Sequence, residues 1–178
     1  MKTRLKTPTT QILAIMRVLA WVVFFGLVIK SGAIAISYAV SCVNPQAAKT
    51  LYKGLDMYEL QQFNFWHYTL AVAYVIAVPV LQAWMSFLVI KTLSKVNLTN
   101  PFKIQVAGLL EKISYTLALI WVVSVGSAVH AYALRKVSDV ALRAEILGEF
   151  LFFAGLVFII SQVFKRGVEI QSENDLTV

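Results

Sequence analysis

No residue between Ile113 and Leu134 carries a formal charge at neutral pH. A helix of about twenty such residues crosses a hydrocarbon layer of roughly 30 Å. Three further apolar runs with few charges are also long enough to cross it, so the sequence predicts an all-α integral membrane protein with four transmembrane helices. The predicted spans cover residues 12–30, 68–90, 113–134 and 146–164.

The composition supports this class of protein. Hydrophobic residues make up 59% of the 178 residues and charged residues only 14%, whereas about a quarter of the residues of ordinary soluble domains are charged. The net charge of +7 could indicate nucleic-acid binding, but the basic residues lie scattered at the ends of the apolar runs and form no dense patch. We therefore expect no direct binding of nucleic acid. Without a repeat or linker, residues 1–178 are predicted to form a single domain.

The first span allows two placements, because Arg17 and Lys30 interrupt its apolar run. A span over residues 12–30 brings both long side chains near headgroups, whereas a span over residues 18–40 places Lys30 near the middle of the membrane. The first placement is favoured, since a lysine at that depth costs about 3 kcal/mol. A cleaved signal peptide ending near residues 33–35 is an alternative, but the chain continues apolar past that site.

Lysine and arginine residues divide unevenly between the two sides of the membrane. Ten lie on the side of the two termini and five on the other, with Lys30 left to the membrane. The positive-inside rule then predicts that both termini and the connection between the second and third spans are cytoplasmic.

Two Asn-Pro pairs predict helix starts. Asn100 can cap the third long helix, with Pro101 at its first position, where a missing amide hydrogen costs nothing. Asn44 and Pro45 repeat this pattern in the first loop, and Gly54 can end the short helix that follows them.

Sequence motifs of catalysis are absent. The chain has no HExxH, GxSxG or P-loop sequence and no paired cysteines. We expect no enzymatic activity, no cofactor and no metal site. His67 and His130 could meet at the outer side, but two scattered histidines are more often interface residues than metal ligands.

Three ionisable residues fall at a similar depth near the outer side, namely Lys30, His130 and Glu149. A charge that faces lipid is costly, whereas a hydrogen-bonded pair is tolerated. This predicts an intramembrane polar cluster in which Glu149 faces Lys30 or His130. The alternative is that each side chain reaches the interface separately.

Two stretches resemble the signatures of a known family. The NPF sequence at residues 100–102 and FKRGVEIQSENDLTV from Phe164 to the end are similar to those of Domain of Unknown Function 2975, a family of small bacterial four-span membrane proteins. Asn100 stands where a serine or another small polar residue is often found, and it keeps the capping role. The resemblance implies a location, the inner (plasma) membrane of a bacterium, and an architecture, but no activity. Through genomic arrangement it also implies a partner, a small helix-turn-helix regulator.

We therefore expect a sensing or regulatory protein that contacts a cytoplasmic DNA-binding regulator. The two signature stretches emerge at the same side of the membrane and predict a partner surface of Phe102, Lys103, Arg166, Glu173, Asn174 and Asp175. An alternative is a small transporter or channel with Glu149 as its coupling residue. Because four helices rarely enclose a path, that function requires a homo-oligomer. A third alternative is an assembly factor for a larger membrane complex.

Overall fold

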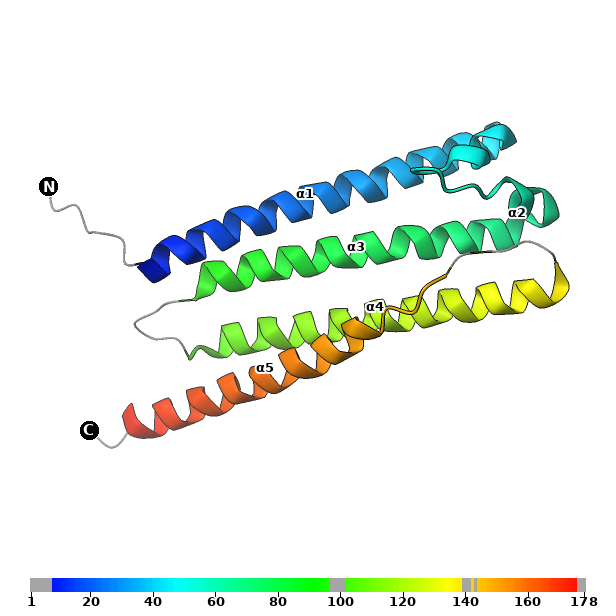
Figure 1. The fold of residues 1–178 in the computed structure, drawn as a ribbon. Coiled ribbons are helices and arrows are strands. Elements are labelled where there is room, and N and C mark those ends of the chain that lie inside the picture. The colour runs from blue at the N-terminus through cyan, green and yellow to red at the C-terminus, as the bar shows by residue number, and fades with distance from the viewer. Residues whose placement is uncertain (1–7, 97–101, 139–141, 143, 176–178) are drawn as a thin grey trace, which may run out of the picture.

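A row of four long helices forms the molecule in a computed structural model that describes residues 8–96, 102–138, 142 and 144–175 (Figure 1). The long helices are α1 (Pro8–Val43), α3 (Phe65–Lys95), α4 (Ile104–Val137) and α5 (Gly148–Asp175). The 3-10 helix η1 (Pro45–Thr50) and the short helix α2 (Tyr58–Phe63) connect α1 to α3. All four long helices are long and apolar enough to cross a membrane. The predicted all-α, four-span class is confirmed.

Each long helix packs against its neighbours in the order α1, α3, α4, α5. Within the described residues, α1 makes no backbone contact with α4 or α5, and α3 makes none with α5. The helices alternate in direction, so the start of α1, the α3–α4 connection and the end of α5 lie together (Figure 1). We call the end of the row where α3 ends at Lys95 and α4 begins at Ile104 the hairpin end. The opposite end, which contains η1 and α2, is the loop end. That the hairpin end is cytoplasmic stays a prediction.

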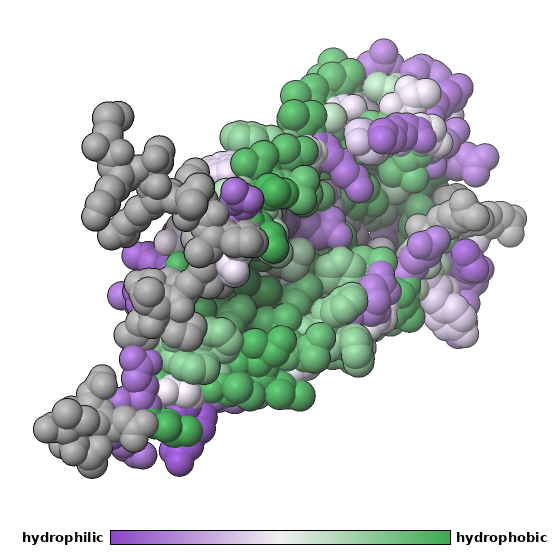
Figure 2. Space-filling view, turned by 60° about the vertical axis from the view of Figure 1, so that its left-hand side comes forward, coloured by the Kyte–Doolittle hydropathy of each residue, from purple (hydrophilic) through white to green (hydrophobic). Residues whose placement is uncertain are grey.

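The surface of the row is apolar along its middle. Figure 2 shows hydrophobic residues over the long central part and hydrophilic residues gathered toward the two ends. On α1, for example, Val22 is 65% exposed and Ile29 is 71% exposed. Water would penalise such a surface, whereas acyl chains cover it without cost.

Helix α1 continues past Lys30 to Val43 and so contains both placements considered for the first span. The part beyond Lys30 is helical because it packs on α3 near the loop end. Ile34 is fully buried there, and the hydroxyl groups of Ser41 and Tyr68 are hydrogen-bonded to each other.

The predicted start of the third long helix at Pro101 is wrong. Helix α4 begins at Ile104 with Lys103 as its N-cap residue and no capping side chain. Asn100 and Pro101 themselves lie outside the described residues. Phe102 is not helical because its ring lies against α5, as described below.

The predicted short helix in the first loop is confirmed in its start, but it ends at Thr50 and not at Gly54. The Asn44 side chain accepts a hydrogen bond of 3.1 Å from the Gln46 amide, and Pro45 follows it as the first residue of η1. Gly54 has a φ of 81°, a left-handed conformation that suits glycine, in the turn after η1. This turn reverses the chain toward α2.

Residues 144–147, which lead into α5, run back alongside α4 (Figure 1). The Leu142 carbonyl accepts a hydrogen bond of 3.1 Å from the Arg135 guanidinium, and the Leu147 amide donates one of 3.1 Å to the Ser124 hydroxyl. Ser124 lies about 20 Å from Val137 along α4, at 1.5 Å per residue. Helix α5 therefore begins well inside the length of α4.

Replacing Ser124 with alanine should lower the thermal stability of the protein. The partly buried Leu147 amide would lose its acceptor, at a cost of about 1 kcal/mol. Thermal unfolding in detergent micelles and hydrogen exchange of the Leu147 amide measure the effect. Ser172→Ala is the control, because the Ser172 hydroxyl bonds only the Glu169 carbonyl of its own helix. Equal losses in the two variants would contradict this role.

Candidate functional site

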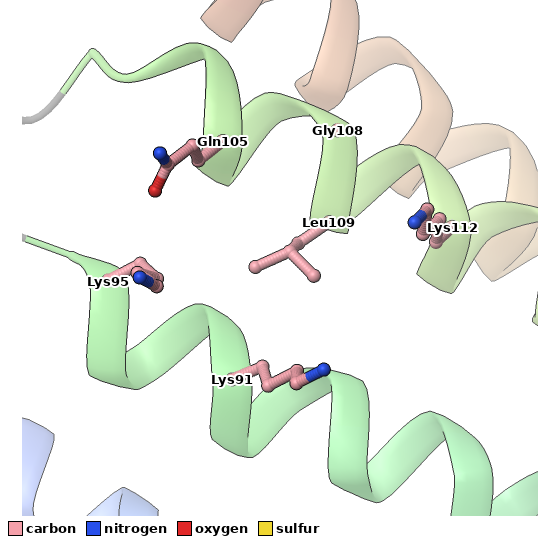
Figure 3. Close-up of a pocket in the computed structure, with 6 residues that line it drawn as sticks. All are labelled: Lys91, Lys95, Gln105, Gly108, Leu109 and Lys112. Carbon is pink, nitrogen blue, oxygen red and sulfur yellow. The ribbon is translucent and has the colours of Figure 1, made fainter.

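A pocket of about 390 Å³ lies between α3 and α4 at the hairpin end. Two of its residues come from α3 and are one turn apart, so they share a face of that helix. The other four come from α4 and face them across the opening (Figure 3). We call this site the lysine pocket, and it is lined by Lys91, Lys95, Gln105, Gly108, Leu109 and Lys112.

Its shape depends on small and apolar residues of α4. A Cβ atom added at Gly108 would meet nothing within 4 Å, so the glycine leaves the wall open. Leu109 projects from α4 toward α3 and supplies an apolar surface between the lysines (Figure 3). The Lys91 ammonium lies 4.9 Å from the centroid of the Phe87 ring, a cation–π contact that orients it.

The charge of the lysine pocket is not neutralised by the described residues. Its three lysines are exposed and make no ion pair with any of them. Glu111 is the single acidic residue between Gln61 and Ser138 in the sequence. Its carboxylate pairs instead with Lys165 of α5 at 2.9 Å. The pocket can therefore attract an anionic group.

The two stretches that resemble family signatures meet at an α4–α5 junction, formed by Phe102, Phe164 and Gly167. The Phe102 and Phe164 rings pack edge to face with centroids 5.5 Å apart. A Cβ atom at Gly167 would lie 2.5 Å from Cδ1 of Phe102, so only glycine leaves room for the ring. This contact explains why an aromatic residue before α4 and a glycine in α5 belong together.

The residues of the predicted partner surface all belong to the hairpin end. Phe102 is part of the α4–α5 junction, and Lys103 is half-buried as the N-cap residue of α4. Arg166 is exposed and pairs with Glu169 at 2.7 Å, while Glu173 is exposed on α5. The backbone of Asn174 and Asp175 belongs to α5, but their side chains lie outside the described part of the structure. Their role in binding a partner stays a prediction.

The residues of the predicted polar cluster do not meet within one chain. Lys30 on α1 and Glu149 on α5 are both exposed, and neither makes a hydrogen bond or ion pair with any described residue. The reason is the row, since α3 and α4 separate α1 from α5. His130 faces α3 and contacts neither of them.

His67 and His130 do come together, as the sequence allowed. Nδ1 of His67 lies 3.1 Å from Nε2 of His130, and the ring centroids are 5.3 Å apart. One nitrogen must donate and the other accept, so the pair joins α3 to α4. Among the described residues, no group of three His, Cys, Asp or Glu side chains could hold a metal ion.

The lysine pocket was not predicted from the sequence, because lysines at the ends of apolar runs were interpreted only as topology signals. The four-residue spacing of Lys91 and Lys95, and the seven-residue spacing of Gln105 and Lys112, each place a pair on one helix face. A short connection between the two helices brings such faces close together. These spacings were the signal that could have indicated the site.

The four apolar helices and the charged residues at their ends define an α-helical, four-span membrane protein. The chain belongs to the family described as Protein of unknown function (DUF2975), which it matches over residues 7–178. The matched region includes both stretches of the α4–α5 junction. Comparisons with curated proteins and with solved structures gave no match.

Replacing Gly167 with alanine should destabilise the α4–α5 junction. The new methyl group would force the Phe102 ring or the helix backbone to move, at a cost of about 1–3 kcal/mol. Thermal unfolding and the protease sensitivity of the α3–α4 connection measure the effect. Gly155→Ala is the matched control on α5, because a Cβ atom there meets nothing within 4 Å. A Gly167→Ala protein as stable as the control protein would refute the proposed clash.

Proposed function

We propose that this protein is a non-catalytic regulatory protein that binds a cytoplasmic protein partner at its hairpin end. The observation that carries the proposal is the lysine pocket, which presents three exposed lysines without a neutralising carboxylate among the described residues. A volume of about 390 Å³ suits a few side chains of an inserted segment.

The pocket favours an acidic segment of the partner. Aspartate or glutamate side chains would pair with the lysines, while an apolar residue of the segment would contact Leu109. Charge complementarity of this kind raises the association rate and excludes basic partners. The lysines of the pocket therefore determine which proteins can bind.

The partner that we propose is a small helix-turn-helix regulator of transcription. The family resemblance suggests such a regulator, and the uneven distribution of lysine and arginine residues supports a cytoplasmic hairpin end. Arg166 and Glu173 of α5 would add contacts beside the pocket. By holding the regulator at the bacterial inner membrane, the protein would control its access to DNA without binding DNA itself.

Reversing the charge of the lysine pocket should abolish partner binding. The variant carries Lys91→Glu, Lys95→Glu and Lys112→Glu, and the assay is co-purification with small helix-turn-helix regulators expressed from the same genome. We expect at least a tenfold loss, because three attractive charges become repulsive. The control reverses Lys49, Lys53 and Lys136, which lie at the loop end and change the net charge equally.

A photo-reactive residue in place of Gln105 should cross-link the regulator in the wild-type background. A second variant, with Glu173, Asn174 and Asp175 changed to alanine, tests the predicted partner surface. If the lysine variant retains the regulator at wild-type level, the pocket is not the binding site. If the alanine variant also retains it, α5 makes no essential contact.

One observation favours the alternative, an oligomeric transporter that uses Glu149. Helix α5 starts beside Ser124, so Glu149 lies deeper along the row than an outer end would place it. Proton-driven uptake into vesicles, if lost with Glu149→Gln, would support transport. Uptake equal to that of empty vesicles would exclude it.

A further inference from the structure

Two charges of opposite sign lie exposed on the two edge helices of the row. Lys30 belongs to α1 and Glu149 to α5, and neither pairs with any described residue of its own chain. Lipid covers the exposed apolar side chains around them without cost, so those side chains do not call for a protein partner. Exposed charges differ, because the hydrocarbon of a membrane offers them no partner.

Both charges lie far from the hairpin end. The Arg17 guanidinium donates a hydrogen bond of 3.0 Å to the Leu93 carbonyl near that end, and Lys30 lies about 20 Å further along α1. On α5, Glu149 lies about 24 Å from Lys165. With a hydrocarbon layer of roughly 30 Å, both positions fall within its outer part.

Contacts between α1 and α3 fix the level of Lys30. Near one end, the Phe24 and Phe87 ring centroids are 6.1 Å apart. Near the other end, the Tyr38 hydroxyl lies 3.0 Å from the Thr69 hydroxyl. Lys30 lies between these contacts and is therefore level with the middle of α3, where Pro79 lies.

Contacts between α3 and α4 show which residue of α4 lies at the same height along the row as Pro79. Tyr74 lies against Gly126, since a Cβ atom added there would be 3.4 Å from the Tyr74 hydroxyl. The two helices are antiparallel, so Pro79, five residues after Tyr74, is level with Trp121, five residues before Gly126.

Contacts between α4 and α5 show which residue of α5 lies at the same height along the row as Trp121. The Ser124 hydroxyl accepts a hydrogen bond from the Leu147 amide. Trp121, three residues before Ser124, is then level with Phe150, three residues after Leu147, and Glu149 adjoins Phe150. Lys30 and Glu149 therefore lie at the same level of the row to within about one helical turn.

We propose that two copies of this chain associate face to face, with α1 of each beside α5 of the other, so that Lys30 of each copy pairs with Glu149 of the other. A two-fold axis along the membrane normal places both pairs in one closed dimer. The paired helices are antiparallel, because α5 runs opposite to α1. A contact between two α1 helices would instead oppose two lysines.

The physical basis is the mutual neutralisation of two charges that lipid cannot solvate. In a medium of low dielectric constant, a paired lysine and glutamate attract each other strongly. This attraction offsets the free-energy cost of removing each charge from water. Glu149 also lies in the first turn of α5, where the helix dipole favours a carboxylate. The inference does not depend on the lysine pocket, which lies at the hairpin end.

Charge exchange between differently tagged chains tests the dimer. The variants Lys30→Glu and Glu149→Lys are expressed alone, as a double variant and as a mixed pair, and co-purification is measured after reconstitution into lipid nanodiscs. Each single variant should lose association at least tenfold, because each interface then joins like charges. The mixed pair and the double variant should regain it, because both interfaces again join opposite charges.

Lys53→Glu on the exposed loop is the control and should associate like the wild type. Circular dichroism confirms the helix content of each variant, and the double variant and the mixed pair remain informative even where a single variant folds poorly. A monomeric wild type, single variants that associate like the wild type, or a mixed pair and double variant that fail to regain association would each overturn the proposal.

Discussion

The packing of four helices in a row is the constraint on which the rest of the structure depends. The middle helices α3 and α4 each have two neighbours, and the polar contacts that join helices lie on them, including the His67–His130 pair and the bond from Leu147 to Ser124. The edge helices α1 and α5 have one neighbour each, so most of their surface faces lipid. Each polar contact described between long helices thus involves α3 or α4, while the edge helices carry two charges, Lys30 and Glu149, without partners among the described residues.

The charged residues at the hairpin end form two groups, which lie on opposite sides of α4. Glu111 and Lys165 bind α5 to α4, and the Phe102 ring over Gly167 strengthens that junction. Because the Glu111 carboxylate pairs with Lys165 of α5, it does not neutralise the pocket lysines between α3 and α4. Those lysines can attract an anionic group from outside the chain. The ion pair thus lies on the side of α4 that faces α5, and the lysine pocket lies on the side that faces α3.

The class of fold was predictable because four long apolar runs with few charges leave a chain few alternatives to spanning a membrane. The short helix after Asn44 was predictable too, since its cap is local. The order in which the helices pack was not predictable, because helix faces that contact lipid and helix faces that contact protein are equally apolar. The start of α4 and the lysine pocket depend on contacts across helices, Phe102 with α5 and Lys91 with α4, and no local pattern encodes their register.

The separation of α1 and α5 within one chain tests the row most directly. Spin labels on cysteines in place of Met16 and Ile170, which are 48% and 47% exposed, report this distance at the hairpin end when Cys42 is serine and unlabelled chain is in excess. Neighbouring helices lie 8–10 Å apart, so the three spacings from α1 to α5 predict a separation of about 24–30 Å between the helix axes. A distance distribution that corresponds to an axis separation of about 10 Å, as for adjacent helices of a closed bundle, would contradict the packing of the four helices in a row.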